Sequence, residues 1–426
     1  MHEPLWLAII LVTLLGVAAG RLPGLAMNRT TICLVGATSL VLSGAISRPA
    51  AWQAIDLDTI VLLLAMMVVN VHLRWAGFFQ WVARWTITRA LPPAGLLAGL
   101  MLLSGILSAL FVNDTVVLAL TPLVVEVVRA SGLPPVPFLM GLATSANIGS
   151  VATIIGNPQN MLIGMASGIP YQRFLFALAP VALGGLIIAW ILLVFLYRHT
   201  WKSLPETVDL EPTVSRLRGA APDPARGKGA ALPPGPPSQS FIRKNFAVSA
   251  LLLLALLLGM PVAMAALSAA SLLLITRKTS PEAVFREIDW SLLVFFAALF
   301  VVTRAVETTG LSRWIFQELN VGQHLDVPSL TLIGALLSNL VSNVPAVLLL
   351  RPVVELLPTP ETAWLTLAMA STLAGNLTLL GSVANLIVAE TAQKQNVTLS
   401  FRAYLVAGIP ITLLTLTWGV LWLLYR

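Results

Sequence analysis

Gly156-Asn157-Pro158-Gln159-Asn160 interrupts an apolar stretch that runs over residues 137–168. Glycine leaves the backbone free to depart from the helical conformation, and proline supplies no amide hydrogen for a helical hydrogen bond. A second polar interruption, Gly381-Ser382-Val383-Ala384-Asn385, follows Gly375-Asn376 in the apolar stretch 362–395. These sequences predict that two long apolar helices each break near the middle.

The chain around these breaks has the composition of a membrane protein. Of its 426 residues, 58% are hydrophobic and only 10% are charged, whereas about a quarter of the residues in a soluble domain are charged. Apolar stretches of about 20 residues, enough to cross a bilayer, recur along the chain. The first, residues 4–20, lacks the basic start and the cleavage site of a secretory signal, so we predict a retained helix. The sequence therefore predicts an all-α polytopic membrane protein.

The apolar spans fall into two similar sets. The predicted spans are residues 5–20, 30–46, 58–73, 137–168 and 174–198, then 245–258, 261–276, 288–305, 362–395 and 403–424. In each set a further segment, 94–130 or 328–357, has two apolar arms around a polar tip. We therefore expect each half to hold about five transmembrane helices, one of them broken, and one re-entrant hairpin.

Motifs in the first set return in the second at a nearly constant distance along the chain. The recurring pairs are Ile55-Asp56 with Ile288-Asp289, Gly77 and Trp81 with Gly310 and Trp314, the two hairpin tips, and the two helix breaks. An odd number of spans in each copy would insert the second copy upside down, which is a transporter architecture. We predict a first inverted repeat over residues 1–198, a linker over 199–242 and a second repeat over 243–426.

The charges between the spans predict the orientation. Residues 199–242 are rich in proline and arginine and cannot bury a core, which is typical of a flexible linker. Most basic residues of the short loops share one side of the membrane if the hairpins do not cross it, and this side should be cytoplasmic. The linker is then cytoplasmic, the N-terminus lies outside, and a bacterial inner (plasma) membrane is the expected location. Segments 77–89 and 310–320 are predicted to lie along the membrane surface.

The breaks and the hairpin tips together predict a binding site. Irregular backbone is tolerated at membrane depth only where protein buries it or where it lines a cavity. The tips, residues 113–115 and 342–345, would approach the breaks from opposite faces, and half-helix N-termini there favour anionic or strongly polar solutes. The candidate substrate-binding residues are Asn113, Thr115, Asn147, Thr153, Gly156, Asn157, Gln159, Asn160, Ser342, Asn343, Asn376, Thr378, Gly381, Ser382 and Asn385. The alternative is that these amides only join helices by hydrogen bonds.

Two charged residues near the tips have candidate roles. Asp114 is the one acid at a hairpin tip, and a charge at bilayer depth is costly unless it is paired, hydrated or protonated. We predict that it couples transport to an ion, and its alternative role is a helix N-cap. Arg351 lies on the return arm of the second hairpin, where it could attract an anion or extend towards the membrane surface.

Other chemistries lack the residues they need. The four histidines are isolated, no group of His, Asp or Glu has the spacing of a catalytic metal site, and Cys33 is a single cysteine. The sequence contains no glycine-rich phosphate-binding loop, which argues against direct use of ATP. Basic residues do not cluster as nucleic-acid binding requires. We therefore predict no cofactor, no bound metal, no enzymatic activity and no nucleic-acid partner.

The chain resembles the ion transporter superfamily, in particular its arsenite/antimonite permease branch and related bacterial anion permeases. The matching motifs are Phe111-Val112-Asn113-Asp114, Gly156-Asn157-Pro158-Gln159-Asn160, Ser342-Asn343-Val344-Pro345 and Gly381-Ser382-Val383-Ala384-Asn385-Leu386. The resemblance covers nearly the whole chain and implies an elevator-type carrier, usually a homodimer, in which both hairpins and both broken helices move against a scaffold. The tips differ from the Ser-Asn-Thr of the sodium-coupled dicarboxylate branch. The pentapeptide at residues 156–160 also differs from the typical arsenite permease.

Our leading hypothesis is a secondary active transporter of a small inorganic solute, with arsenite or antimonite efflux coupled to protons through Asp114. The alternative is a carrier of another anion, a sulfate-like oxyanion or a small carboxylate, driven by H⁺ or Na⁺. An intramembrane lipid-modifying enzyme would need clustered acids or histidines, and a channel fits two opposed breaks less well than a carrier does. The expected partners are the solute, the coupling ion, the lipid bilayer and a second copy of the chain, with a cytoplasmic ATPase subunit as a further candidate.

Overall fold

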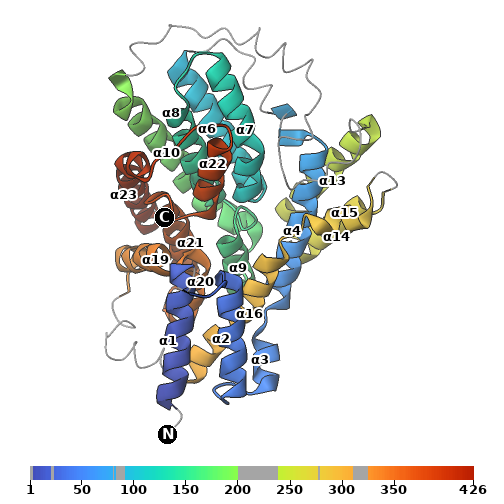
Figure 1. Cartoon of the computed structure of the whole chain (residues 1–426), viewed down its shortest axis with the longest axis vertical. Coiled ribbons are helices and arrows are strands. Elements are labelled where there is room, and N and C mark those ends of the chain that lie inside the picture. Colours follow the sequence, from blue (N-terminus) through green and yellow to red (C-terminus); the bar gives the residue numbers. More distant parts are fainter. Residues whose placement is uncertain are drawn as a thin grey trace.

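The computed structural model describes residues 3–20, 24–79, 81–82, 92–199, 238–276, 279–309 and 325–426, and these contain helices and no strands (Figure 1). The predicted surface segment 310–320 lies outside these residues, as do most of the surface segment 77–89 and most of the predicted linker. The prediction of an all-α chain is confirmed over the described residues.

The helices of the first half are α1 (Glu3–Ala19), α2 (Arg29–Leu42), α3 (Arg48–Ala54), α4 (Leu57–Trp75), α6 (Pro93–Leu110), α7 (Asn113–Ala130), α8 (Pro135–Ser150), α9 (Pro158–Ser167) and α10 (Tyr171–Leu196). Those of the second half are α13 (Gln239–Leu257), α14 (Val262–Leu274), α15 (Pro281–Arg286), α16 (Trp290–Thr308), α19 (Val327–Val341), α20 (Asn343–Val354), α21 (Pro360–Leu373), the 3₁₀ turn η1 (Ala374–Asn376), α22 (Val383–Gln393) and α23 (Phe401–Tyr425). Long and short helices follow one another in the same order in both halves.

The recurring Ile-Asp motif begins the same helix in each half. Asp56 accepts a hydrogen bond from the Thr59 amide (2.9 Å) at the start of α4, and Asp289 accepts one from the Leu292 amide (3.0 Å) at the start of α16. An N-cap of this kind satisfies one of the amides that the first helical turn leaves without a partner. The motif therefore recurs because both helices need the same cap.

The short helices α3 and α15 were not predicted. Each begins with a serine N-cap, Ser47 or Ser280, followed within two residues by a proline in the first turn. This combination is a helix-start signal even without an apolar span. Both helices lie just before the capped helices α4 and α16, so they belong to the repeated pattern.

Contacts between the halves agree with two inverted copies. α4 of the first half packs against α14 of the second half, and α16 of the second half packs against α2 of the first half. Since α16 is the equivalent of α4 and α14 is the equivalent of α2, the same pair of helices meets twice. Arg74, near the end of α4, forms an ion pair with Glu287, the C-cap of α15 shortly before α16. Thr30, at the start of α2, donates to the Ser291 carbonyl (3.2 Å) at the start of α16. The equivalent helices α4 and α16 therefore run in opposite directions.

The two predicted helix breaks are confirmed. α8 ends at Ser150 and α9 begins at Pro158, so the first break covers residues 151–157 and starts earlier than the glycine. α21 ends at Leu373, the chain makes the 3₁₀ turn η1, and α22 begins at Val383. The two hairpins are also present: α6 and α7 meet at Phe111-Val112, and α19 and α20 meet at Ser342. In Figure 1 α6, α7, α8, α10, α22 and α23 gather apart from α2, α4, α14 and α16, and α9 lies between the two groups.

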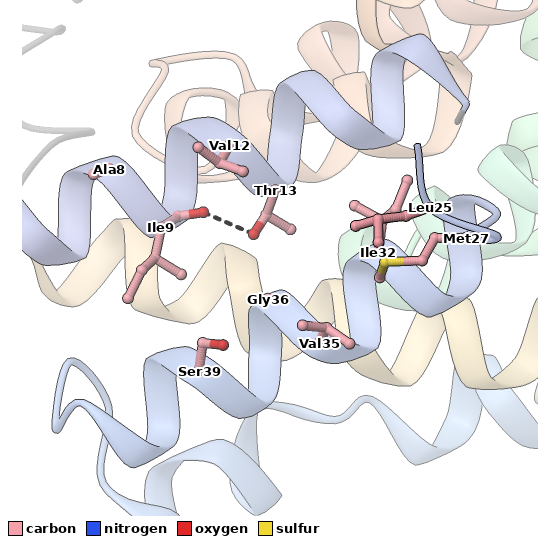
Figure 2. A pocket seen from close by; sticks show the side chains of 10 residues that line it. All are labelled: Ala8, Ile9, Val12, Thr13, Leu25, Met27, Ile32, Val35, Gly36 and Ser39. Carbon is pink, nitrogen blue, oxygen red and sulfur yellow. Dashed lines mark hydrogen bonds between the residues drawn. The ribbon is translucent and has the colours of Figure 1, made fainter. Parts of the chain in front are cut away.

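The surface of the long helices suits a bilayer. Within the described residues, α4, α6, α10, α13, α16 and α23 are long and apolar enough to cross a membrane. Large apolar side chains on α10 and α23 lie exposed, including Phe176 (70%) and Leu413 (57%). A pocket of about 360 Å³ between α1 and α2 is also lined almost wholly by apolar groups, and Thr13 in it donates to the Ile9 carbonyl (Figure 2). The protein is an integral membrane protein, and this pocket offers no site for a polar solute.

A close helix crossing holds the first hairpin against the first broken helix. A methyl group at Gly149 of α8 would lie 2.1 Å from the Gly105 carbonyl oxygen of α6. At the equivalent crossing of α19 and α21, a methyl group at Gly334 would lie 3.3 Å from the nearest atom, the Ala370 methyl carbon. Small residues at such crossings let membrane helices approach closely.

We expect Gly149→Ala to destabilise the fold because the added methyl group clashes with the backbone of α6, at a cost of about 1–3 kcal/mol or more. Gly334→Ala is the matched control. Alanine improves helix propensity there by about 1 kcal/mol, and its methyl group makes a tight contact with Ala370 but does not clash. Thermal unfolding of the two purified variants measures the difference. Equal melting temperatures for the two variants would contradict the close crossing.

Candidate functional site

Asn147 of α8 joins the two halves of the chain. Its Nδ2 donates to the side-chain oxygens of Asn376 (2.9 Å) and Asn385 (3.0 Å), which belong to the second broken helix. Its Oδ1 accepts from Asn113 Nδ2 (3.1 Å) at the first hairpin tip and from Ser382 Oγ (3.0 Å). The side chain is 2% exposed. One amide therefore links the first tip, the first broken helix and the second break.

An asparagine after each break satisfies the carbonyls that the break leaves free. Asn160 Nδ2 donates to the carbonyls of Ser150 and Thr153, both at 3.0 Å. In the second half, Asn385 Nδ2 donates to the carbonyls of Gly375 (2.8 Å) and Thr378 (3.1 Å). The same two bonds recur at matching positions, so the repeat extends to individual hydrogen bonds. Buried carbonyls need such partners because water is absent at this depth.

Thr372, at the end of α21, connects the second half to the first break. Its hydroxyl accepts from Asn157 Nδ2 (3.3 Å) and Gln159 Nε2 (3.2 Å) and lies 3.4 Å from Asn160 Oδ1. Asn157 also caps α9 through the Asn160 amide (2.9 Å). Thr372 was not among the predicted site residues, because nothing in an apolar helix shows which neighbour its hydroxyl will meet.

Each hairpin tip contacts the break of its own half. The Asn113 amide donates to the Gly156 carbonyl (3.0 Å). At the second tip, Asn343 Nδ2 would lie 3.6 Å from a methyl group at Gly375, and Asn343 Oδ1 is buried with no hydrogen-bond partner in the part of the chain that the structure describes. The N-termini of α7, α9, α20 and α22 thus converge on the breaks, and each terminus carries a partial positive charge. Every side chain in the network around Asn147, Asn160 and Asn385 is neutral.

The remaining predicted residues lie around this network. Thr153 donates to the Ala109 carbonyl of α6, and the Gly381 amide donates to the Thr378 carbonyl (3.0 Å). Arg351 donates to Glu355 (2.9 Å) on its own helix and is not part of the network. The structure thus gives Arg351 a partner other than a solute.

Ser342 has a strained backbone at the second tip. Its φ of 81° and ψ of 159° lie in a region that residues other than glycine rarely adopt. Such strain costs of the order of 1–3 kcal/mol and is concentrated at functional sites. The strain lets α20 begin directly after α19 ends, so the second tip is a single residue.

A second set of polar residues lines a cavity of about 230 Å³ beside the first tip. Asp114 and Thr115 of α7 line it together with Asn70 and Arg74 of α4, and Glu287 and Asp289 line it where α16 begins. Asp114 is not the N-cap of α7: this position is Val112, and the Asp114 amide donates to Asn113 Oδ1 (2.9 Å). Asp114 therefore lies in the first turn of the helix with its carboxylate on the cavity.

Asn70 is the unexpected member of this group. It is 3% exposed, lies within an otherwise apolar part of α4, and its Oδ1 has no hydrogen-bond partner in the described part of the chain. Leaving a buried amide oxygen unsatisfied costs about 1–3 kcal/mol. A lone asparagine between Met66 and Val71 is visible in the sequence, but only the structure shows that it shares a cavity with Asp114.

Comparison with known proteins identifies the family. A protein-family model described as "Citrate transporter" (CitMHS) matches residues 6–374. The chain belongs to this family. A relative from Oryza sativa, "Silicon efflux transporter LSI3", is 33% identical and the alignment covers 93% of each chain. "Putative transporter arsB" from Dictyostelium discoideum is 27% identical over 93% of this chain and 87% of its own length.

A solved structure supports the fold. The Alcanivorax borkumensis YdaH transporter superposes with a TM-score of 0.56 and covers 99% of this chain and 98% of its own, at 17% identity. With the family match and the apolar helices, this agrees with the predicted superfamily. The protein is therefore a membrane transporter of the citrate transporter family, and not an enzyme.

We expect Asn147→Leu to lower both stability and transport, because it removes four hydrogen bonds and leaves several buried partners unsatisfied at about 1–3 kcal/mol each. Asn245→Leu is the control: Asn245 of α13 is also buried, and its side chain donates to the Phe241 carbonyl of its own helix (2.8 Å) rather than to the other half of the chain. Melting temperature and solute flux measure the effects. Similar losses of stability and of solute flux in the two variants would show that Asn147 contributes no more than another buried asparagine.

Ser342→Gly should relieve the strain at the second tip. We expect a gain of about 1 kcal/mol after the added chain entropy of glycine, whereas Ser342→Ala should keep the strained backbone. Chemical or thermal unfolding of the purified variants checks the order of stability. A glycine variant less stable than the alanine variant would contradict the strained conformation.

Proposed function

We propose that this protein exports a small, neutral inorganic hydroxide such as arsenite or antimonite in exchange for protons. The observation that carries the proposal is the neutral network of amides and hydroxyls around Asn147, at which four helix N-termini converge. Arsenite and antimonite are weak acids that are uncharged at neutral pH, and their hydroxyl groups both donate and accept hydrogen bonds. Amide side chains do the same.

The absence of positive side chains in this network argues against a citrate-like substrate. Carboxylate recognition in a buried site generally uses arginine or lysine, because an unpaired buried charge is expensive. The network includes neither residue, and Arg351 is paired with Glu355. Two relatives fit the same chemistry, since their names refer to silicon efflux and to arsB.

A carrier of a small oxyanion is the second candidate. The four helix N-termini could stabilise one negative charge without any cationic side chain, as they do at many anion sites. The description of the family as citrate transporters also favours an anion. In either case the movement we propose is of the elevator type, with the hairpins and broken helices moving as one body in a homodimer.

Transport by the purified protein in proteoliposomes tests the substrate. We expect arsenite to move in a saturable way, faster with an opposing proton gradient, and antimonite and silicic acid to compete with it. Sulfate and citrate at equal concentration should compete weakly. Transport of sulfate or citrate without movement of arsenite would reject the proposal in favour of the anion carrier.

Asp114→Asn should abolish proton coupling but retain exchange of arsenite down its own gradient, because the amide cannot release a proton. The measurement compares accumulation driven by a pH gradient with counterflow at equal pH on both sides. Asp58→Asn is the matched control, since Asp58 lies in the first turn of α4 as Asp114 does in that of α7. Full proton-driven accumulation by Asp114→Asn would exclude this aspartate as the coupling site.

A further inference from the structure

The cavity beside Asp114 is distinct from the neutral network around Asn147. It lies where the first tip and the helices after both breaks, α9 and α22, meet the beginning of α16 and the middle of α4. Its polar groups come from both sides of this boundary: Asp114 from the hairpin, and Asn70 and Asp289 from the opposing helices. A solute here would touch two parts of the protein that the proposed transport cycle moves past each other.

The charges of the cavity select against anions. Three carboxylates line it, those of Asp114, Glu287 and Asp289, against the single guanidinium of Arg74. That guanidinium is already paired with Glu287. A sulfate or citrate ion would therefore meet a net negative field.

Hydrogen-bond acceptors dominate the same surface. The Asn70 Oδ1 is buried and has no hydrogen-bond partner among the described residues, and one oxygen of Asp289 accepts from the Leu292 amide while a carboxylate has further capacity to accept. The walls between these groups are apolar, formed by side chains such as Leu63, Met67 and Met161. Within the described residues no three His, Cys, Asp or Glu side chains are placed to hold a metal ion. Separated acceptors on apolar walls fit several O–H donors better than one cation.

We propose that this cavity is the loading site for a neutral, polyhydroxylated weak acid, and that Asn70 and Asp289 accept its hydroxyl hydrogens together with Asp114. This proposal rests on the proposed function and adds to it a site and two binding residues on the helices that face the hairpin. Asp289 is exposed and lies next to Arg286, on the side that the basic loops predict to be cytoplasmic. A solute leaving the cell would enter there.

Equilibrium binding of arsenite to the full-length protein in nanodiscs at pH 7 tests the site. Asn70→Leu keeps the side-chain volume but removes the acceptor, and we expect the Kd for arsenite to rise about tenfold, as for one lost hydrogen bond. Asn245→Leu is the matched control, because Asn245 is also a buried asparagine whose Oδ1 has no partner among the residues the structure describes, but it does not line the cavity. An Asn70→Leu Kd within twofold of the wild type would overturn the proposal.

Asp289→Asn gives a second test that does not depend on a buried substitution. Asparagine caps helices as well as aspartate does, so the fold should be kept. We expect the Kd for arsenite to rise about threefold or more, because a neutral acceptor replaces a charged one. Asp56→Asn removes the equivalent cap charge of the first half, away from the cavity, and should leave the Kd unchanged. Equal Kd values for these two variants would also reject the site.

Competition separates this proposal from its rivals. Replacing choline by Na⁺ at constant ionic strength should leave arsenite binding unchanged, and displacement of arsenite by Na⁺ would show that the acidic cavity holds a cation instead. If the wild-type protein bound neither arsenite nor silicic acid but did bind sulfate or citrate, the proposed function itself would fail. If arsenite bound with the same affinity to all variants, only the loading site would fail.

Discussion

The fold depends on satisfying backbone carbonyls where two helices break inside a membrane. Water is not available there, so each freed carbonyl needs a donor from the protein. Asn160 and Asn385 supply that donor, each with one Nδ2 group that reaches two carbonyls of its own break. With these bonds in place, irregular backbone can persist at depth. Without them, the breaks would be too costly for a polar site to exist.

The same amides join the first hairpin and the two broken helices by buried hydrogen bonds. Asn147 and Thr372 join the first broken helix to the second, and Asn113 joins the first tip to the first broken helix through Asn147 and the Gly156 carbonyl. The α4 and α16 side faces the first tip mainly across a cavity rather than through this network. Two parts of a protein that face each other across a cavity can move past each other more easily than two parts joined by amides, because fewer buried hydrogen bonds must be exchanged. The proposed movement is therefore most readily placed between the hairpin and α4.

The breaks could be predicted from the sequence because glycine, proline and asparagine act locally on the backbone. The Ile-Asp caps and the hairpin tips could be recognised for the same reason, since a cap depends on residues within one helical turn. Thr372 and Asn70 could not be assigned, because their partners come from distant helices and a single polar residue in an apolar span has many uses. The short helices α3 and α15 were missed because the sequence was searched for spans, although their serine and proline starts were readable.

The distribution of charge completes the argument for selectivity. The network around Asn147 is neutral and the cavity beside it is acidic, so a solute on the proposed path meets many acceptors and donors, and the guanidinium of Arg74 is paired with Glu287. An anion would cross a region of net negative charge before reaching the helix N-termini, and a hard cation would meet the apolar walls of the cavity. A neutral molecule with several hydroxyl groups avoids both costs, since each hydroxyl can replace a water at an acceptor and then exchange with an amide. The two proposed sites therefore agree on one class of solute for different physical reasons.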